Sequence, residues 1–195
     1  MYDKEKSELK DSIKSIYIAT KERVNDRVIR GHSRSISTDI ENCIALFLYK
    51  LLPEGFQYYL DPTVKANGHT SRPDLLIIDD SNNVFAFVEI KSNMGYCRDA
   101  QPVIDRMIEN DKNYKTEGNL KCEFSSEDES FTVTYTNEVK KMLISLTKDN
   151  CKDEKHENNK SYAQSKGISY YNLFTKWYDG LEDYEIDLLI EEIQK

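Results

Sequence analysis

The 195-residue sequence lacks the features that define several large classes of protein. No apolar run is long enough to cross a membrane, and the charged N-terminus has no signal-peptide core. The four cysteines form no CxxC pair and the three histidines do not cluster near them, so a zinc site is not expected. Reduced thiols in a cytoplasmic protein are the simplest interpretation.

Net positive charge is also missing, because 27 Lys and Arg residues face 35 Asp and Glu residues, for a formal charge of −8. A protein that coats nucleic acid non-specifically would normally be basic. One local basic face is enough for specific binding, so the acidic balance does not exclude a nucleic-acid partner. With no internal repeat and no low-complexity linker, residues 1–195 are expected to form a single domain.

The most informative feature that is present is a pair of apolar runs interrupted by charges. Residues 72–79 and 84–92 flank a short polar turn, which predicts a β-hairpin. Both runs are apolar on both faces, so the strands are expected at the centre of a sheet. Asp74, Glu89 and Lys91 lie within them, and buried charges are costly unless they are paired or bound to metal.

The register of this hairpin places the three charges together. With a two-residue turn at 81–82, or with a four-residue loop at 80–83, Asp74 lies directly opposite Glu89. Lys91 is two residues further along and projects from the same face. Two carboxylates that close repel each other, and a hard divalent cation with oxygen ligands, Mg²⁺ first, would relieve the repulsion.

Pro73-Asp74, followed after fourteen residues by Glu89-Ile90-Lys91, resembles the PD-(D/E)XK nuclease superfamily, which includes many restriction endonucleases and Holliday-junction resolvases. The resemblance implies an α/β fold with a restriction-endonuclease-like αβββαβ core, in which helices flank a mixed central sheet. It also implies that Asp74 and Glu89 bind metal together with the backbone carbonyl of Ile90, and that Lys91 is catalytic. The alternative is a surface salt bridge of Lys91, which the apolar surroundings disfavour.

The order of the expected elements agrees with this core independently of the motif. A helix, three strands, a helix and a strand follow one another between about residues 38 and 147. A polar loop is expected over 63–71 and an inserted hairpin or loop over 115–138. The remaining expected elements are helix 3–30, helix 38–52, strand 55–60, a helix beginning near Pro102, strand 141–147, a loop and surface helix from 149, strand 167–174 and helix 181–193.

Glu41 has two interpretations. It follows Thr38 by three residues at the start of the expected helix 38–52, so its side chain fits a capping box that returns to the Thr38 backbone. Alternatively, it points inward toward the hairpin. The superfamily often carries an acidic residue on the helix before the sheet, and the resemblance implies that Glu41 is this catalytic residue and a possible ligand of a second metal ion.

Several basic residues are candidates for DNA binding. Three arginines of the expected N-terminal helix have the spacing of one stripe, which suits phosphate contacts or, equally, a solvated face with local acidic partners. An arginine after the motif suits a bidentate phosphate contact or a pair with Asp99. The candidates are Arg23, Arg27, Arg30, Lys65, Arg72 and Arg98.

Taken together, these patterns predict a Mg²⁺-dependent DNA endonuclease of the restriction type, in which Mn²⁺ can substitute. The alternatives are a structure-specific resolvase or repair nuclease, and a non-catalytic nucleic-acid-binding protein that keeps the fold. The full set of Asp74, Glu89 and Lys91 argues against the non-catalytic alternative. DNA is the expected partner, no membrane is expected, and a homodimer is a possible assembly.

Overall fold

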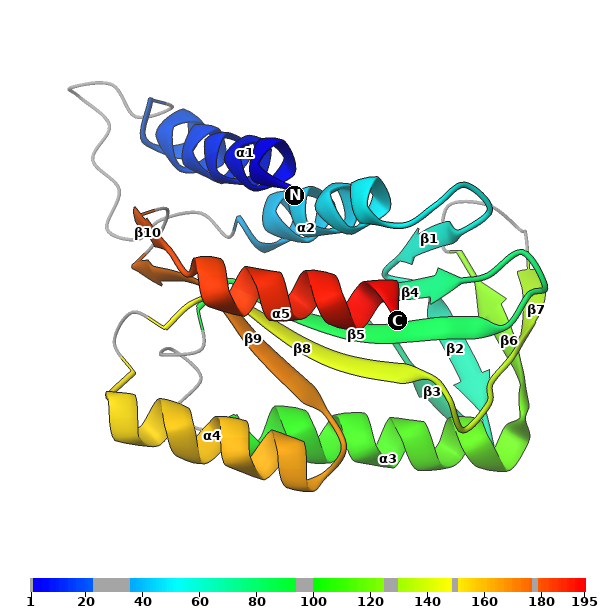
Figure 1. Ribbon diagram of the computed structural model, residues 1–195. Coiled ribbons are helices and arrows are strands. Elements are labelled where there is room, and N and C mark those ends of the chain that lie inside the picture. Colours follow the sequence, from blue (N-terminus) through cyan, green and yellow to red (C-terminus); the bar gives the residue numbers. More distant parts are fainter. Residues whose placement is uncertain (1, 23–35, 94–99, 125–129, 149–150, 177–178) are drawn as a thin grey trace.

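The computed structural model describes residues 2–22, 36–93, 100–124, 130–148, 151–176 and 179–195, which form five helices and ten strands (Figure 1). In chain order they are α1 (Asp3–Glu22), α2 (Ser37–Leu51), β1 (Gln57–Leu60), β2 (Thr63–Ala66), β3 (His69–Ser71), β4 (Leu75–Ile78), β5 (Val84–Lys91), α3 (Gln101–Glu117), β6 (Asn119–Glu123), β7 (Ser130–Thr134), β8 (Lys140–Thr147), α4 (Asp153–Ser165), β9 (Ser169–Lys176), β10 (Asp179–Leu181) and α5 (Asp183–Gln194).

The strands form two sheets. The larger has the order β1-β4-β5-β8-β9-β10, and the smaller has the order β3-β2-β6-β7. In the larger sheet β5, β8 and β9 are parallel neighbours while the other pairs are antiparallel, so the sheet is mixed. The elements α2, β1, β4, β5, α3 and β8 follow the predicted αβββαβ order, which confirms the expected core with added terminal helices.

Helices cover both faces of the larger sheet. In Figure 1, α1, α2 and α5 lie on one side of it and α3 and α4 on the other. The side chains of β4 alternate between these two layers: Leu75 and Ile77 pack with α1, α2 and α5, whereas Leu76 and Ile78 pack with α3. All four are buried, which explains why the sequence of this strand is apolar on both faces.

The hairpin of β4 and β5 has the predicted register near its open end. Leu75 pairs with Val88, and Ile77 pairs with Ala86. The same register, extended by one residue, sets Asp74 opposite Glu89. The turn itself differs from both predicted forms, because the Asp79 and Asn83 backbones bond across it. A β-bulge at Ile77–Ile78 absorbs the difference of one residue and leaves the register beyond it unchanged.

Two other expectations were wrong. Residues 63–71 form the hairpin of β2 and β3, not a loop, and Asn67 and Gly68 take the positive φ values of 49° and 74° that a two-residue hairpin turn requires. Helix α2 has Ile36 at its N-cap without a side-chain cap bond, so Thr38 lies inside the helix and does not cap it. The capping-box interpretation of Glu41 therefore fails.

The expected insertion after α3 is the hairpin of β6 and β7. Strand β6 pairs with β2, so this hairpin and the hairpin of β2 and β3 form one sheet. Helix α1 is described as far as Glu22, and the rest of the expected helix 3–30 lies outside the described residues. The short strand β10 was not expected. In the described part of the chain, no helix has the length and apolar character needed to span a membrane.

Candidate active site

The three charged residues of the motif meet at one end of the β4–β5 hairpin. Asp74 directly precedes β4, and Glu89 and Lys91 lie near the end of β5. The Nζ atom of Lys91 is 2.9 Å from Asp74 Oδ2 and 3.0 Å from Glu89 Oε2. Two carboxylates and one ammonium group therefore converge, as the hairpin register predicts.

Backbone groups of Ile90 complete this arrangement. The Ile90 N–H donates a hydrogen bond to Asp74 Oδ2 at 2.6 Å, and the Ile90 carbonyl accepts one from Lys91 Nζ at 3.0 Å. The two carboxylates and the Ile90 carbonyl thus surround a single positive charge. These are the three oxygen donors that the motif assigns to a metal ion.

Burial and charge shift the ionisation of Glu89 and Lys91. Burial of the Glu89 side chain, which is 1% exposed, raises the pKa of its carboxyl, the negative charge of Asp74 raises it further, and Lys91 opposes both. Burial acts to lower the pKa of Lys91, but the charges of Glu89 and Asp74 outweigh it and raise the pKa above its ordinary value. Lys91 is therefore a charged hydrogen-bond donor at neutral pH.

A second cation contacts the same oxygen of Glu89. Arg106, on α3, places Nη2 3.0 Å from Glu89 Oε2, and its side chain is 56% exposed. The sequence analysis did not single out this arginine. Its sole signal is its position on the helix after the motif, and such a position does not show which way a side chain points.

Glu41 and Asp61 bring further negative charge to the site. Burial raises the pKa of Glu41 to about 7, with smaller contributions from the charges of Asp74 and Asp61. Glu41 therefore lies within electrostatic reach of the motif, in agreement with the inward-pointing alternative. Asp61 follows β1 and donates its backbone N–H to the Asp74 carbonyl at 3.1 Å, and burial raises the pKa of its carboxyl. Asp61 was not among the site residues predicted from the sequence.

A cavity of about 580 Å³ opens beside Asp74. One part of its lining comes from β3 and from Arg72 and Asp74, which follow this strand. Another part comes from α3. The charged and imidazole groups on the walls are Asp61, His69, Arg72, Asp74, Arg106 and Glu109. Of the three motif residues, Asp74 lines this cavity.

The predicted DNA-binding residues are distributed unevenly. Arg72 lines this cavity and donates from Nε to Thr63 Oγ1 at 3.2 Å. Lys65 lies on β2 in the smaller sheet, where its Nζ is 2.7 Å from Glu123 Oε2, and it does not line the cavity. The remaining four candidates, Arg23, Arg27, Arg30 and Arg98, lie outside the described residues.

The donor chemistry of the site fits a hard divalent cation. Within the described ranges, no three His, Cys, Asp or Glu side chains are close enough together to form a ready metal cluster. The two motif carboxylates and the Ile90 carbonyl nevertheless gather around one cation, the ammonium of Lys91. Oxygen ligands of this kind are those that Mg²⁺ prefers.

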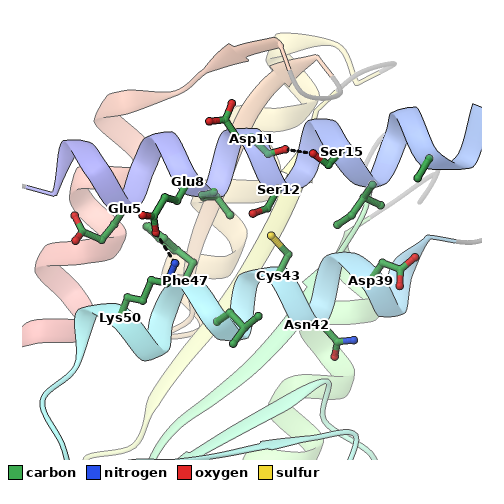
Figure 2. Close-up of a pocket in the computed structure, with 14 residues that line it drawn as sticks. Glu5, Glu8, Asp11, Ser12, Ser15, Asp39, Asn42, Cys43, Phe47 and Lys50 are labelled. Carbon is green, nitrogen blue, oxygen red and sulfur yellow. Dashed lines mark hydrogen bonds and ion pairs between the residues drawn. The ribbon is translucent and has the colours of Figure 1, made fainter.

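A larger cavity, of about 680 Å³, lies between α1 and α2 and is unsuited to a phosphate backbone. Figure 2 shows Glu5, Glu8 and Asp11 along one helix and Asp39 on the other, with Lys50 directed at Glu8. The cavity is lined by four carboxylates and one lysine, and this excess of negative charge would repel a polyanion. Of these two cavities, the one beside Asp74 is therefore the better candidate for nucleic acid.

Comparisons with known proteins support the fold. No family model and no curated protein matches the chain. Among solved structures, P. aeruginosa ATCC27853 NucC in its cAAA-bound form is 12% identical, with 98% of this chain and 88% of that chain covered and a TM-score of 0.57. E. coli MS115-1 NucC, also cAAA-bound, is 10% identical, with 99% and 88% covered and a TM-score of 0.55. The chain has the restriction-endonuclease-like fold.

Proposed function

We propose that the chain is a metal-dependent DNA endonuclease that hydrolyses phosphodiester bonds. The observation that carries the proposal is the convergence of Asp74, Glu89 and the Ile90 carbonyl on Lys91 Nζ, at the open end of a central hairpin. The likeness to NucC, a nuclease of the same fold, supports it. An ordinary surface salt bridge does not account for a glutamate that is 1% exposed.

In this proposal Asp74, Glu89 and the Ile90 carbonyl hold Mg²⁺, for which Mn²⁺ can substitute, and Glu41 contributes to a second ion. When bound, the metal supplies Lewis-acid stabilisation of charge on the phosphoryl oxygens. Glu41 is suited to this role because burial, together with the charges of Asp74 and Asp61, makes its carboxyl costly to ionise, so a nearby cation would be stabilising.

Lys91 would act on the substrate directly. Its place on β5, two residues after Glu89, keeps its ammonium on the face of the proposed metal ligands, whose oxygens it contacts in the metal-free protein. A donor in this position can orient the attacking water and stabilise the negative charge that develops on the phosphoryl group.

Incubation of the purified protein with plasmid DNA and with branched DNA, in Mg²⁺ or in EDTA, tests the proposal. Discrete plasmid fragments in Mg²⁺ and none in EDTA are expected for the restriction type. Cleavage confined to branched DNA would indicate a resolvase or repair nuclease instead. DNA that stays intact in Mg²⁺ and in Mn²⁺ would contradict the enzymatic proposal, and Asp74→Asn serves as the inactive control.

A further inference from the structure

Arg106 has more hydrogen-bonding capacity than its contact with Glu89 uses. A guanidinium group carries five N–H donors, and in the described part of the chain the Arg106 side chain has Glu89 Oε2 as its hydrogen-bond partner, at 3.0 Å. The same glutamate oxygen already accepts from Lys91 at 3.0 Å. Neutralising Glu89 therefore does not require Arg106.

The exposure of the two cations separates their roles. The side chain of Lys91 is 22% exposed, whereas that of Arg106 is 56% exposed and lines the cavity beside Asp74. Arg106 is therefore anchored at one nitrogen, while more than half of its side chain is exposed.

A second guanidinium lines the same cavity from a different element. Arg72 follows β3 and is exposed, and its Nε is positioned by Thr63 Oγ1 at 3.2 Å. Arg106 belongs to α3, so two different elements each bring one positive group to the cavity that Asp74 also lines. Planar guanidinium groups match phosphate oxygens through paired hydrogen bonds.

The other charges on the walls limit what this cavity can hold. Asp61 and Glu109 also line it, so the cavity does not present the continuous positive surface that a long stretch of backbone would require. One phosphate between two guanidinium groups fits this pattern better.

We propose that Arg106 is a substrate-binding residue that, together with Arg72 of the same cavity, binds one backbone phosphate of the DNA strand beside the carboxylate site. This inference rests on the proposed function, since it assigns a subsite to the same substrate. Arg106 would keep its contact with Glu89 at one nitrogen or exchange it for the phosphate when a divalent cation takes the glutamate oxygen.

The test compares Arg106→Ala, Arg106→Lys and Lys112→Ala. Lys112 is exposed on the same helix and does not line the cavity, so its loss removes one positive charge without removing the subsite. Affinity for a short DNA duplex is measured in EDTA, where no cleavage occurs, over a range of salt concentrations. Affinity for Mg²⁺ is measured by calorimetry, and thermal melts check that each variant is folded.

Arg106→Ala is expected to weaken DNA binding by about tenfold to 100-fold and to reduce the slope of log affinity against log salt by about one unit. Its Mg²⁺ affinity should stay within about threefold of wild type, because Arg106 is not one of the proposed metal ligands and all of those ligands remain. Arg106→Lys should recover part of the DNA affinity, since it keeps the charge and loses the paired donors.

A DNA affinity and salt slope equal to those of Lys112→Ala would overturn the inference. So would weakened Mg²⁺ binding with unchanged DNA binding, which would indicate that Arg106 only positions Glu89. The proposed function is tested separately by cleavage with the wild-type protein. A wild type that binds DNA through Arg106 without cutting it would defeat the enzymatic proposal and leave this inference standing, whereas a wild type that does not bind DNA would defeat both.

Discussion

Lys91 Nζ lies 2.9 Å from Asp74 Oδ2, although the two residues are 17 positions apart in the chain. The hairpin of β4 and β5 brings them together, because its register sets Asp74 opposite Glu89 and alternation along β5 sets Lys91 on the same face. Folding of the hairpin thus creates the cluster. The chemistry proposed for this chain depends on the cluster, in which Lys91 is expected to serve cleavage and Asp74 to serve metal binding.

Lys91→Ala should slow DNA cleavage on the order of 100-fold to 1000-fold, because one positioned donor to developing charge is lost. In Mg²⁺ its melting temperature should change little, since the cation still compensates Asp74 and Glu89. Lys160→Ala is the matched control, because Lys160 forms a partly buried ion pair with Glu185 outside this site. The control should lower the melting temperature and leave the cleavage rate unchanged. A Lys91→Ala protein that cuts DNA at the wild-type rate would remove this lysine from the mechanism.

Asp74→Asn should abolish Mg²⁺ binding, because the neutral amide loses the charge that holds a hard cation. The replacement is close in size, so the fold should persist. Asp80→Asn removes the same charge from the exposed turn of the same hairpin and should bind Mg²⁺ as the wild type does. Isothermal titration calorimetry measures all three proteins. Equal affinities for wild type and a folded Asp74→Asn variant would show that the metal does not bind here.

The sequence predicted the register of this hairpin correctly but predicted its turn wrongly. Pairing was inferred from symmetry about the turn, and the actual connection is one residue different from either predicted form. The β-bulge at Ile77–Ile78 restores the pairing because it places one extra residue on one strand. Burial of both faces of β4 favours this outcome, since a slip of one residue would exchange its core faces and misplace Asp74.

Arg106 and Asp61 could not be predicted by the same reasoning. The motif residues lie on paired strands, where position in the sequence determines which side chains face each other. Arg106 reaches Glu89 from α3, and the way a helix packs on a sheet depends on the whole interface. Asp61 reaches the site because the chain turns sharply after β1, with a φ of 49°. Neither feature has a local signal in the sequence.

Asp79→Ala should destabilise the hairpin turn by about 1 kcal/mol. The Asp79 carboxylate accepts hydrogen bonds from the Ser81 and Asn83 backbones at 2.9 and 2.8 Å and from Asn83 Nδ2 at 3.0 Å. Partial burial acts to raise its pKa, but these bonds outweigh burial and hold the pKa below the ordinary value. Its stabilisation is therefore present above the unfolded pKa and is lost as pH falls through the lowered folded value.

Urea unfolding of Asp79→Ala and wild type between pH 2 and 7 tests this account of the turn. The two free energies of unfolding should differ near neutral pH and converge in acid, where the wild-type carboxylate is protonated. Asp80→Ala, at the neighbouring exposed position, should follow the wild type throughout. A constant difference between Asp79→Ala and wild type at every pH would show that the ionised carboxylate is not what supports the turn.

Glu41→Gln should have the opposite dependence on pH in metal-free protein. Burial and the charges of Asp74 and Asp61 raise the pKa of Glu41 to about 7, so folding favours its protonated form. Below the unfolded pKa of about 4.3 the group costs nothing, and its cost grows as pH rises toward 7 and is then constant. Because glutamine is neutral at every pH, Glu41→Gln should match the wild type near pH 4 and be more stable than it at pH 8.

Thermal melts in EDTA from pH 4 to 8.5 measure this difference, and a second series in Mg²⁺ tests the proposed role of Glu41 near a second ion. In Mg²⁺ at pH 8 the wild type should regain stability relative to Glu41→Gln, because a bound cation compensates an ionised carboxylate and cannot compensate an amide. Glu54→Gln, at an exposed position after α2, is the control and should follow the wild type in both series. If Glu41→Gln and wild type melt together across the whole EDTA series, then Glu41 ionises freely and does not share the electrostatic environment of Asp74.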